Sequence, residues 1–311
     1  MRNPRKIYAA ISTDAWKHCL VNVAPQSVAW TSTLATELGG LRIDAGQSLD
    51  AVAQAATASV RTNGFALLRG LSADAVDLDD RLRALGNALG RVIVQSPRGE
   101  LVEDVRDVSD LEEQDDRGYR SGGEMVAHSD PPTLIVLHCV TAALSGGETH
   151  LVNVAAIRDR IAADHPTSLA VLQQPFPMWR VDGQGAAPAG PDANGPPVLA
   201  QRNGVLSCVL YRPFIENAAD ALGVPLTSAQ VDALDCFDLH AADPALSLRF
   251  LLRPGETMIL HNRAVLHART DYVDWPELHR RRHLKRLWID APELLPVHRL
   301  HELGDIFAVR R

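Results

Sequence analysis

Short strand-like runs separated by turns fill most of the chain after residue 90, and they constrain the fold more than any other feature. In chain order they are RVIVQ, the stretch ending MVAHSD, TLIVLHCV, THLVNV, VLSCVLY, LSLRFLLR, ETMILHN and RHLKRLWI. Their β-branched and aliphatic residues pack well on a pleated surface. Many short strands, with helices before and between them, predict a mainly β fold with flanking helices, built as a sandwich or jelly roll.

Helical patterns stand at the front of the chain and between these runs. SLDAVAQAATASVRTNG has apolar residues at helical spacing and ends at Gly64, and a buried strand, FALLRGL, is expected to follow it. A second helix through AVDLDDRLRALGNALG closes at Gly90. Later helices are expected in VAAIRDRIAADH, in TSLAVLQQ with Thr167 as its cap, and in LTSAQVDALDCFDLHAAD, opened by Thr227 or Ser228.

No internal repeat or low-complexity tail divides the chain, so we expect a single domain over residues 1–311. A helical cap is expected at 1–63, a jelly-roll core with inserted helices at 64–290, and an extension at 291–311. The segment DGQGAAPAGPDANGPP, residues 182–197, is rich in Gly, Pro and Ala and has no periodicity. It is expected outside the core, either as a plain surface loop or as a lid over a pocket.

Composition limits the expected partners. The chain is 46% hydrophobic and 22% charged, with a net charge of −7 and a pI near 5.9. This profile is that of an ordinary soluble protein without a basic surface for nucleic acid, so a small molecule is the expected partner. The sequence also lacks a signal peptide and an apolar run long enough to cross a membrane, which predicts a cytoplasmic location without membrane association. The four cysteines lack CxxC spacing and are expected to be buried reduced thiols: Cys19, Cys139, Cys208 and Cys236.

A His-x-Asp pair, His128 and Asp130, is the first chemical signal. Residues i and i+2 of a strand face the same way, so both side chains can point inward while Ser129 points out. With 12 His and 38 acidic residues in the chain, one such pair is expected by chance, and a surface hydrogen-bonded pair is the alternative interpretation. The pair gains weight from His267, whose strand can neighbour the first. Two imidazoles and a carboxylate are the ligand set of many non-haem Fe(II) oxygenases.

Two arginines four residues apart, Arg282 and Arg286, share one face of the strand-like run RHLKRLWI. Buried guanidinium groups need anionic partners, and a dicarboxylate would satisfy them. The alternative is a solvated basic run, which suits Arg280 and Arg281 but suits Arg286 poorly because apolar residues flank it. A Zn hydrolase could use the same two-His, one-Asp set, whereas P-loop, HExxH and GxSxG motifs are absent from the sequence.

The chain resembles the taurine dioxygenase (TauD/TfdA) family of Fe(II)- and 2-oxoglutarate-dependent dioxygenases, whose fold is a clavaminate synthase-like double-stranded β-helix. The resemblance extends from about Gly64 through Asp290. The segments that carry it are GFALLRGL, the HSD followed by PP and an apolar strand, SGGETHLVN, LRPGETMILHNRAVLHART and RRHLKRLW. It implies Fe2+ as cofactor, with 2-oxoglutarate and O2 as cosubstrates. The implied reaction is hydroxylation of an unactivated C–H bond, with release of succinate and CO2.

Position by position, the resemblance implies that His128, Asp130 and His267 bind iron. It implies that Thr149 and Arg282 bind the distal carboxylate of 2-oxoglutarate, in agreement with the bidentate geometry that arginine offers a carboxylate. Arg286 matches a second arginine that contacts either the metal-bound end of the oxoacid or an anionic group of the substrate. Because the HSD retains its aspartate, a halogenase, which needs that position open, is disfavoured.

The prime substrate is expected to be a small polar molecule such as an amino acid or a natural-product intermediate. Desaturation, epimerisation and cyclisation use the same iron and stay open beside hydroxylation. Two other functions also stay open, a catalytically silent jelly-roll binding module and the Zn hydrolase. The N-terminal residues are expected to cap the core or to contribute to a homo-oligomer. The candidate substrate contacts are Gln95, Arg120, Glu124, Tyr211, Arg212 and Arg286.

Overall fold

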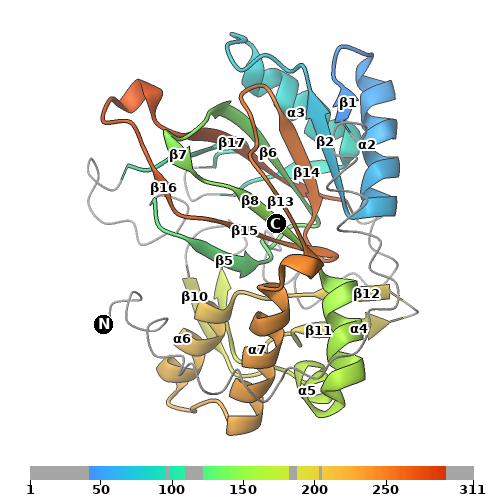
Figure 1. The fold of residues 1–311 in the computed structure, drawn as a ribbon, viewed down its shortest axis with the longest axis vertical. Helices are drawn as coiled ribbons and strands as arrows, with labels where there is room; N and C mark the ends of the chain where they lie inside the picture. The colour runs from blue at the N-terminus through green and yellow to red at the C-terminus, as the bar shows by residue number, and fades with distance from the viewer. Residues whose placement is uncertain (1–41, 96–98, 109–121, 182–187, 203–204, 292–311) are drawn as a thin grey trace.

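The computed structural model describes residues 42–95, 99–108, 122–181, 188–202 and 205–291. The larger of its two main sheets has the strand order β1-β2-β14-β6-β17-β3, and β4 also pairs with β17 (Figure 1). Its strands are β1 (Arg42–Asp44), β2 (Phe65–Arg69), β3 (Arg91–Ile93), β4 (Glu103–Val105), β6 (Leu134–Thr141), β14 (Thr257–His261) and β17 (His283–Asp290). Apart from the parallel β1–β2 pair, neighbouring strands are antiparallel.

The smaller sheet has the order β13-β8-β15-β5 and is antiparallel throughout. Its strands are β5 (Met125–His128), β8 (Thr149–Asn153), β13 (Ser247–Phe250) and β15 (Val265–Arg269). Three antiparallel pairs complete the β structure of the described residues: β7 (Ser145–Gly146) with β16 (Tyr272–Val273), β9 (Met178–Val181) with β10 (Pro188–Asp192), and β11 (Leu199–Arg202) with β12 (Val205–Cys208). Within the described residues the two main sheets form a jelly-roll core that does not close into a barrel.

Helices cover the outer faces of both sheets (Figure 1). They are α2 (Leu49–Asn63), α3 (Leu78–Leu89), α4 (Val154–Asp164), α5 (Pro166–Leu172), α6 (Arg212–Leu222) and α7 (Ser228–Ala241), with short 3-10 turns at Pro244–Leu246 and Leu278–Arg280. Local sequence explains their ends. Ser48 caps α2 through a hydrogen bond from the Ala51 amide, and Gly64 ends the helix at a φ of 81°. Thr227 and Gln230 form a capping box at the start of α7.

Alternation along the strands divides the core into layers. Phe65 and Leu67 of β2 face the smaller sheet, whereas Ala66 and Leu68 face α2 and α3. In β15 of the smaller sheet, Val265 faces the larger sheet, and Leu266 faces the helices on the outer side of the smaller sheet. The period of two residues therefore determines which side chains lie between the sheets.

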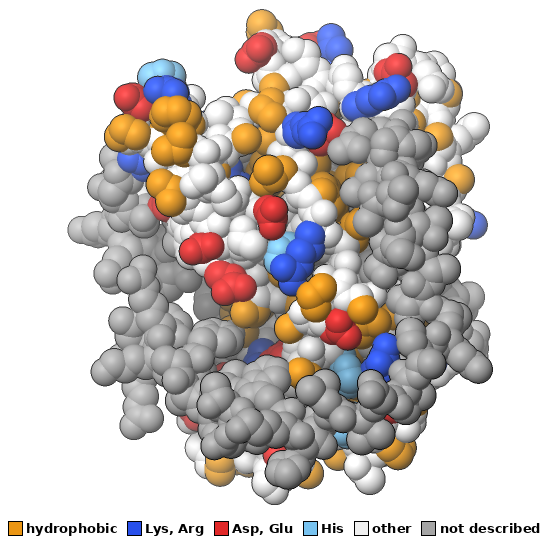
Figure 2. All heavy atoms as spheres, in the orientation of Figure 1, with side chains coloured by type: hydrophobic (Ala, Val, Ile, Leu, Met, Phe, Trp, Pro, Cys, Tyr) orange, Lys and Arg blue, Asp and Glu red, His pale blue; other side chains and the backbone are white. Residues whose placement is uncertain are grey.

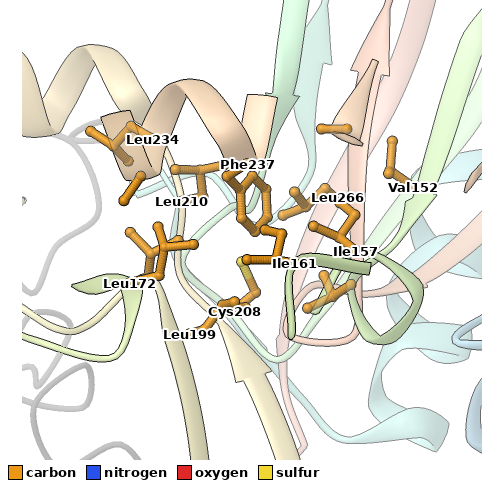
Figure 3. Packing of buried hydrophobic residues seen from close by; sticks show 14 of the residues in the cluster. Val152, Ile157, Ile161, Leu172, Leu199, Cys208, Leu210, Leu234, Phe237 and Leu266 are labelled. Atoms are coloured by element: carbon orange, nitrogen blue, oxygen red, sulfur yellow. The ribbon is translucent and has the colours of Figure 1, made fainter. Parts of the chain in front are cut away.

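A further hydrophobic cluster lies between the smaller sheet and the helices on its outer side. Figure 3 shows Phe237 of α7 packed among side chains of other elements, including Ile161 of α4, Leu210 and Leu266. On the surface, Figure 2 shows a small group of acidic side chains over the smaller sheet, next to basic and histidine side chains. The part of this face that the structure describes therefore carries charges of both signs.

The strand-like runs and the helices ending at Gly64 and Gly90 are confirmed. The expected cap Thr167 is wrong, because α5 begins at Pro166 with His165 as the N-cap, and proline's fixed φ suits the first helical turn. Several elements were not expected, among them α6, β10 and short strands such as β1, β4 and β9, and β10 falls inside the predicted loop 182–197. Residues 182–187 of that loop lie outside the described residues, as do most of the expected cap and nearly all of the extension. None of the helices in the described part of the chain has the length and apolar character that crossing a membrane requires.

His138 is a buried histidine inside the larger sheet. It lies opposite Thr257 on the neighbouring strand, and its Nδ1 is 2.8 Å from the hydroxyl oxygen of that residue. Burial lowers the pKa of His138 to about 4, with a smaller contribution from His283. The folded protein therefore holds this imidazole neutral at a pH where the unfolded chain, with an ordinary pKa near 6.5, takes up a proton.

Stability is expected to fall on acidification, because the unfolded state binds more protons than the folded state between the two pKa values. From pH 7.5 to 5.5, His138 should remove about 1 kcal/mol from the free energy of unfolding. Urea titrations at both pH values, on the unmodified protein and on His138→Gln, measure this contribution as the difference between their pH dependences. An unchanged pH dependence in the variant would contradict the assignment.

Candidate metal centre

His128, Asp130 and His267 meet between the sheets. His128 ends β5 and pairs directly with His267 of β15, so the two rings lie side by side with their centroids 4.2 Å apart. Asp130 follows two residues later, with its Oδ1 3.8 Å from Nε2 of His128. One donor atom from each of the three residues lies within 4.8 Å of the others. The antiparallel register and the two-residue spacing thus bring together the three residues that the sequence singles out.

Both imidazoles are buried between the sheets. Nδ1 of His128 lies 2.8 Å from the carbonyl oxygen of Val126. Because a carbonyl only accepts, Nδ1 donates this hydrogen bond, and Nε2 is the ring nitrogen that faces Asp130. Burial lowers the pKa of His267 to about 3, aided by His128, so the His267 ring is neutral at pH 7. Nδ1 of His267 is buried and has no hydrogen-bond partner among the described residues.

Asp130 is held as a carboxylate. Burial alone would raise its pKa, but the positive charge of Arg286, the two histidines and a hydrogen bond from Trp288 together bring the pKa below its ordinary value. Nη1 of Arg286 lies 3.6 Å from Oδ2, and the Trp288 indole donates to the same oxygen at 3.3 Å. One carboxylate and two imidazoles, clustered and largely buried, fit the ligand set of a divalent metal ion such as Fe(II).

The backbone at Asp130 has its own support. Arg263, whose side chain is only 2% exposed, donates from Nη1 to the Asp130 carbonyl oxygen at 3.2 Å and from Nη2 to the Pro131 carbonyl oxygen. Burial lowers the pKa of this guanidinium to about 10, so it stays charged at neutral pH. Arg263 therefore fixes the turn that aims the carboxylate between the sheets.

A second, cationic part of the site lies at the start of β17. Arg282 is 6% exposed, and its guanidinium carbon lies 5.2 Å from the centre of the Tyr272 ring, with Arg269 packed against the same ring at 4.6 Å. Nη1 of Arg282 is buried without a hydrogen-bond partner among the described residues. A Cβ placed on Gly147 would come within 3.4 Å of Nε of Arg282, so the Gly146-Gly147 turn packs closely against this side chain.

Thr149 lies near this turn at the first position of β8. It is buried at 7% exposure and stands opposite Arg269 in the register of β8 with β15. Leu151, on the same face of β8, belongs to the core between the sheets, so the Thr149 side chain faces the same interior. An unsatisfied guanidinium N–H at Arg282 and an inward threonine hydroxyl are suitable donors for a carboxylate.

The candidate substrate contacts are placed in different surroundings. Gln95 is 2% exposed and accepts a hydrogen bond from Nε of Arg286 at 2.8 Å, so it supports that arginine. The Tyr211 ring lies beside His128, with centroids 5.6 Å apart. Arg212 instead pairs with carboxylates of α6 and α7, and Glu124 is exposed at the edge of β5. Arg120 lies outside the described residues.

Four contacting residues were missed by sequence reasoning: Trp288, Arg263, Arg269 and Tyr272. Trp288 is two residues after Arg286, so the strand period that pairs Arg282 with Arg286 also indicates it. Arg269 is likewise two residues after His267. Arg263 carries no such local signal, because its acceptor at Asp130 is more than a hundred residues away in the chain. Tyr272 carries none either, because its contact with Arg282 is the packing of a guanidinium group on an aromatic ring.

Comparison with known proteins gives consistent results over most of the chain. FR-33289 synthase of Streptomyces rubellomurinus is 29% identical over 254 residues, which cover 76% of this chain and 73% of the synthase. An asparagine oxygenase, solved with Fe(II), 2S,3S-3-hydroxyasparagine and succinate, has the same fold, with a TM-score of 0.61 at 20% identity over 78% of this chain and 82% of its own. The non-heme iron oxygenase OrfP, solved with Fe, succinate and (3S)-hydroxy-L-Arg, gives 0.58 at 14% identity over 86% and 93%.

A family model described as taurine catabolism dioxygenase TauD, TfdA family matches residues 28–288. This span contains the paired histidines, Asp130 and the arginines of β17. The chain therefore belongs to the TauD, TfdA family of dioxygenases.

Proposed function

We propose that the protein is an Fe(II)- and 2-oxoglutarate-dependent dioxygenase whose iron is held by His128, Asp130 and His267. The observation that carries the proposal is the buried cluster of these three donors, with a neutral His267 and an ionised Asp130. When bound, iron and 2-oxoglutarate supply an oxidation in which O2 converts the oxoacid to succinate and CO2 and a substrate C–H bond to C–OH. The asparagine oxygenase and OrfP structures, which contain iron and succinate, support this choice of cofactor and cosubstrate.

We assign the distal carboxylate of 2-oxoglutarate to Arg282 and Thr149. Burying a guanidinium without an anion is costly, and the unpartnered Nη1 of Arg282 leaves a donor for one. The planar arginine fork binds a carboxylate through two parallel hydrogen bonds and so fixes its direction. The role of these residues is to anchor one end of the oxoacid so that its other end lies at the three metal ligands.

Arg286 is proposed to act on Asp130 rather than on substrate. Its guanidinium lies 3.6 Å from Oδ2 of Asp130 and is braced by Gln95, whose amide also donates to the Arg286 carbonyl oxygen at 2.7 Å. This arrangement keeps Asp130 ionised and oriented. It leaves Tyr211, beside His128, as the candidate substrate contact that the described residues support best.

The substrate is proposed to be an amino acid or a related natural-product intermediate, and the reaction a hydroxylation. Two solved relatives support this class through the ligands they contain, hydroxyasparagine in one and hydroxyarginine in the other. FR-33289 synthase supports the natural-product alternative only through its name. Coupled succinate detection over a panel of amino acids and small carboxylates identifies the substrate directly.

Two substitutions separate metal binding from cosubstrate binding. Asp130→Ala should abolish succinate formation, because it removes the anionic metal ligand. Arg282→Ala should mainly raise the KM for 2-oxoglutarate, by about tenfold to a hundredfold, the usual cost of a lost charged hydrogen bond. Arg280→Ala, an exposed arginine of the same basic run, is the matched control and should leave both parameters unchanged. Unaltered kinetics in Asp130→Ala or Arg282→Ala would contradict the assignment.

Anaerobic spectroscopy tests the cofactor proposal without knowledge of the substrate. Adding Fe(II) and 2-oxoglutarate to the metal-free protein should produce a weak visible charge-transfer band, because the oxoacid chelates the iron. Asp130→Ala should not develop the band. A folded, unmodified protein without the band would instead support a silent binding module. Activity that needs neither O2 nor 2-oxoglutarate and requires Zn2+ would support a hydrolase.

The Trp288 indole is expected to tune the metal site through Asp130. Trp288→Phe keeps an aromatic ring in the core but removes the donor to Oδ2, and loss of such a supporting hydrogen bond typically weakens metal binding about tenfold or more. The Fe(II) concentration for half-maximal succinate formation measures the effect. Trp275→Phe, which alters a ring stacked against the exposed Arg280, serves as control. Equal iron requirements in the two variants would exclude the proposed role.

A further inference from the structure

A second cluster of metal-binding residue types lies among the helices outside the smaller sheet. It consists of His165, at the junction of α4 and α5, and Cys236 and His240 of α7. One donor atom from each residue lies within 4.8 Å of the others, the same limit that the three donors between the sheets satisfy. No residue is shared between the two clusters, and no part of the proposed dioxygenase reaction uses this one.

The backbone brings these three side chains to one place. Cys236 and His240 are four residues apart on a helix, a spacing that puts both on one face. His165 is fixed between two helices, since its amide donates to the Ile161 carbonyl oxygen at 2.8 Å and its carbonyl accepts from the Leu169 amide at 3.2 Å. The ring centroids of His165 and His240 are 6.1 Å apart.

Hydrophobic packing holds in place the helices that carry His165, Cys236 and His240. Leu234 and Phe237 of α7 belong to the same hydrophobic cluster as Ile161 of α4 and Leu172 of α5, and all four are fully buried (Figure 3). The ligand-bearing face of α7 is therefore held against the α4–α5 junction by core contacts.

The atoms offered suit a borderline or soft metal ion. Nε2 of His240 is buried and has no hydrogen-bond partner among the described residues, and Cys236 forms no disulfide with the other described cysteines. Zinc binds sulfur at about 2.3 Å and imidazole nitrogen at about 2.0–2.1 Å, so its ligand atoms lie roughly 3.3–3.6 Å from one another. The 4.8 Å limit that the three donor atoms satisfy exceeds that spacing by no more than about 1.5 Å, and all three residues are partly accessible to an entering ion.

We propose that His165, Cys236 and His240 bind a Zn2+-class metal ion at a site separate from the iron centre, which fastens α7 to the α4–α5 junction. Cys236 binds as the thiolate and releases its proton to solvent, and water completes a four-coordinate shell. The donor types indicate which metal ion each of the two sites prefers. A thiolate with two imidazoles favours zinc over ferrous iron, whereas the carboxylate with two imidazoles between the sheets suits iron.

Cobalt provides a spectroscopic test that is independent of the iron site. In His128→Ala/His267→Ala protein, one equivalent of Co2+ should bind and produce the near-ultraviolet band of a cobalt–thiolate bond. Adding Cys236→Ser should remove the band, whereas adding His279→Ala, which alters an exposed histidine outside both clusters, should retain it. A missing band in the double variant, or a band that survives Cys236→Ser, would overturn the proposal.

Thiol protection tests the site in the unmodified chain and does not depend on the folding of variants. Zn2+ should slow alkylation of Cys236 at least tenfold, measured by peptide mass mapping, and a chelator should restore the rate. Fe(II) with 2-oxoglutarate should protect far less. Cys139 and Cys208, which are buried, serve as internal references that Zn2+ should not affect. Alkylation of Cys236 at the same rate with and without Zn2+ would exclude metal binding there, whatever the outcome of the dioxygenase assays.

Discussion

The direct pairing of His128 with His267 across β5 and β15 is the contact on which the rest of the site depends. A shift of one residue in that register would turn one imidazole out of the space between the sheets, because side chains alternate along a strand. The register is held by apolar packing of β15 on both of its faces. Leu266 packs against the outer helices, and Val265 packs between the sheets. The hydrophobic core therefore determines the position of the donors, and the polar centre depends on apolar packing on both faces of one strand.

Buried charge is the second constraint, and the structure satisfies it by pairing. Asp130 is approached by Arg286 and Trp288 at its carboxylate and by Arg263 at its carbonyl oxygen. Gln95 in turn accepts from Arg286. A charge between two sheets is tolerated only when its hydrogen-bonding capacity is met, so these partners are as much part of the fold as of the chemistry. Arg282 differs, since one of its buried N–H groups has no protein partner among the described residues.

Local periodicity explains which parts of this arrangement could be predicted from sequence. His128 with Asp130, and Arg282 with Arg286, follow from the two-residue repeat of a strand, and the helix ends follow from Gly64 and Gly90. The roles of these four side chains, in binding a metal ion and a cosubstrate, are still predictions. Arg212 illustrates what the sequence does not reveal: Glu216 is its local partner four residues along α6, but Asp235 and Asp238 meet it only because α6 lies beside α7. Arg263 is a similar case, since its acceptors lie about 130 residues away.

Strand β17 begins directly after Arg282, and its residues Arg286 and Trp288 contact the carboxylate of Asp130. Four residues of strand span about 13 Å, a distance that the backbone rather than a flexible loop determines. If Arg282 binds the distal carboxylate as proposed, the strand sets the distance from that carboxylate to the three clustered donors. Selection of an acid by its chain length would then be a property of the sheet itself, whereas selection of the molecule to be oxidised would fall to residues such as Tyr211 that lie outside the two main sheets.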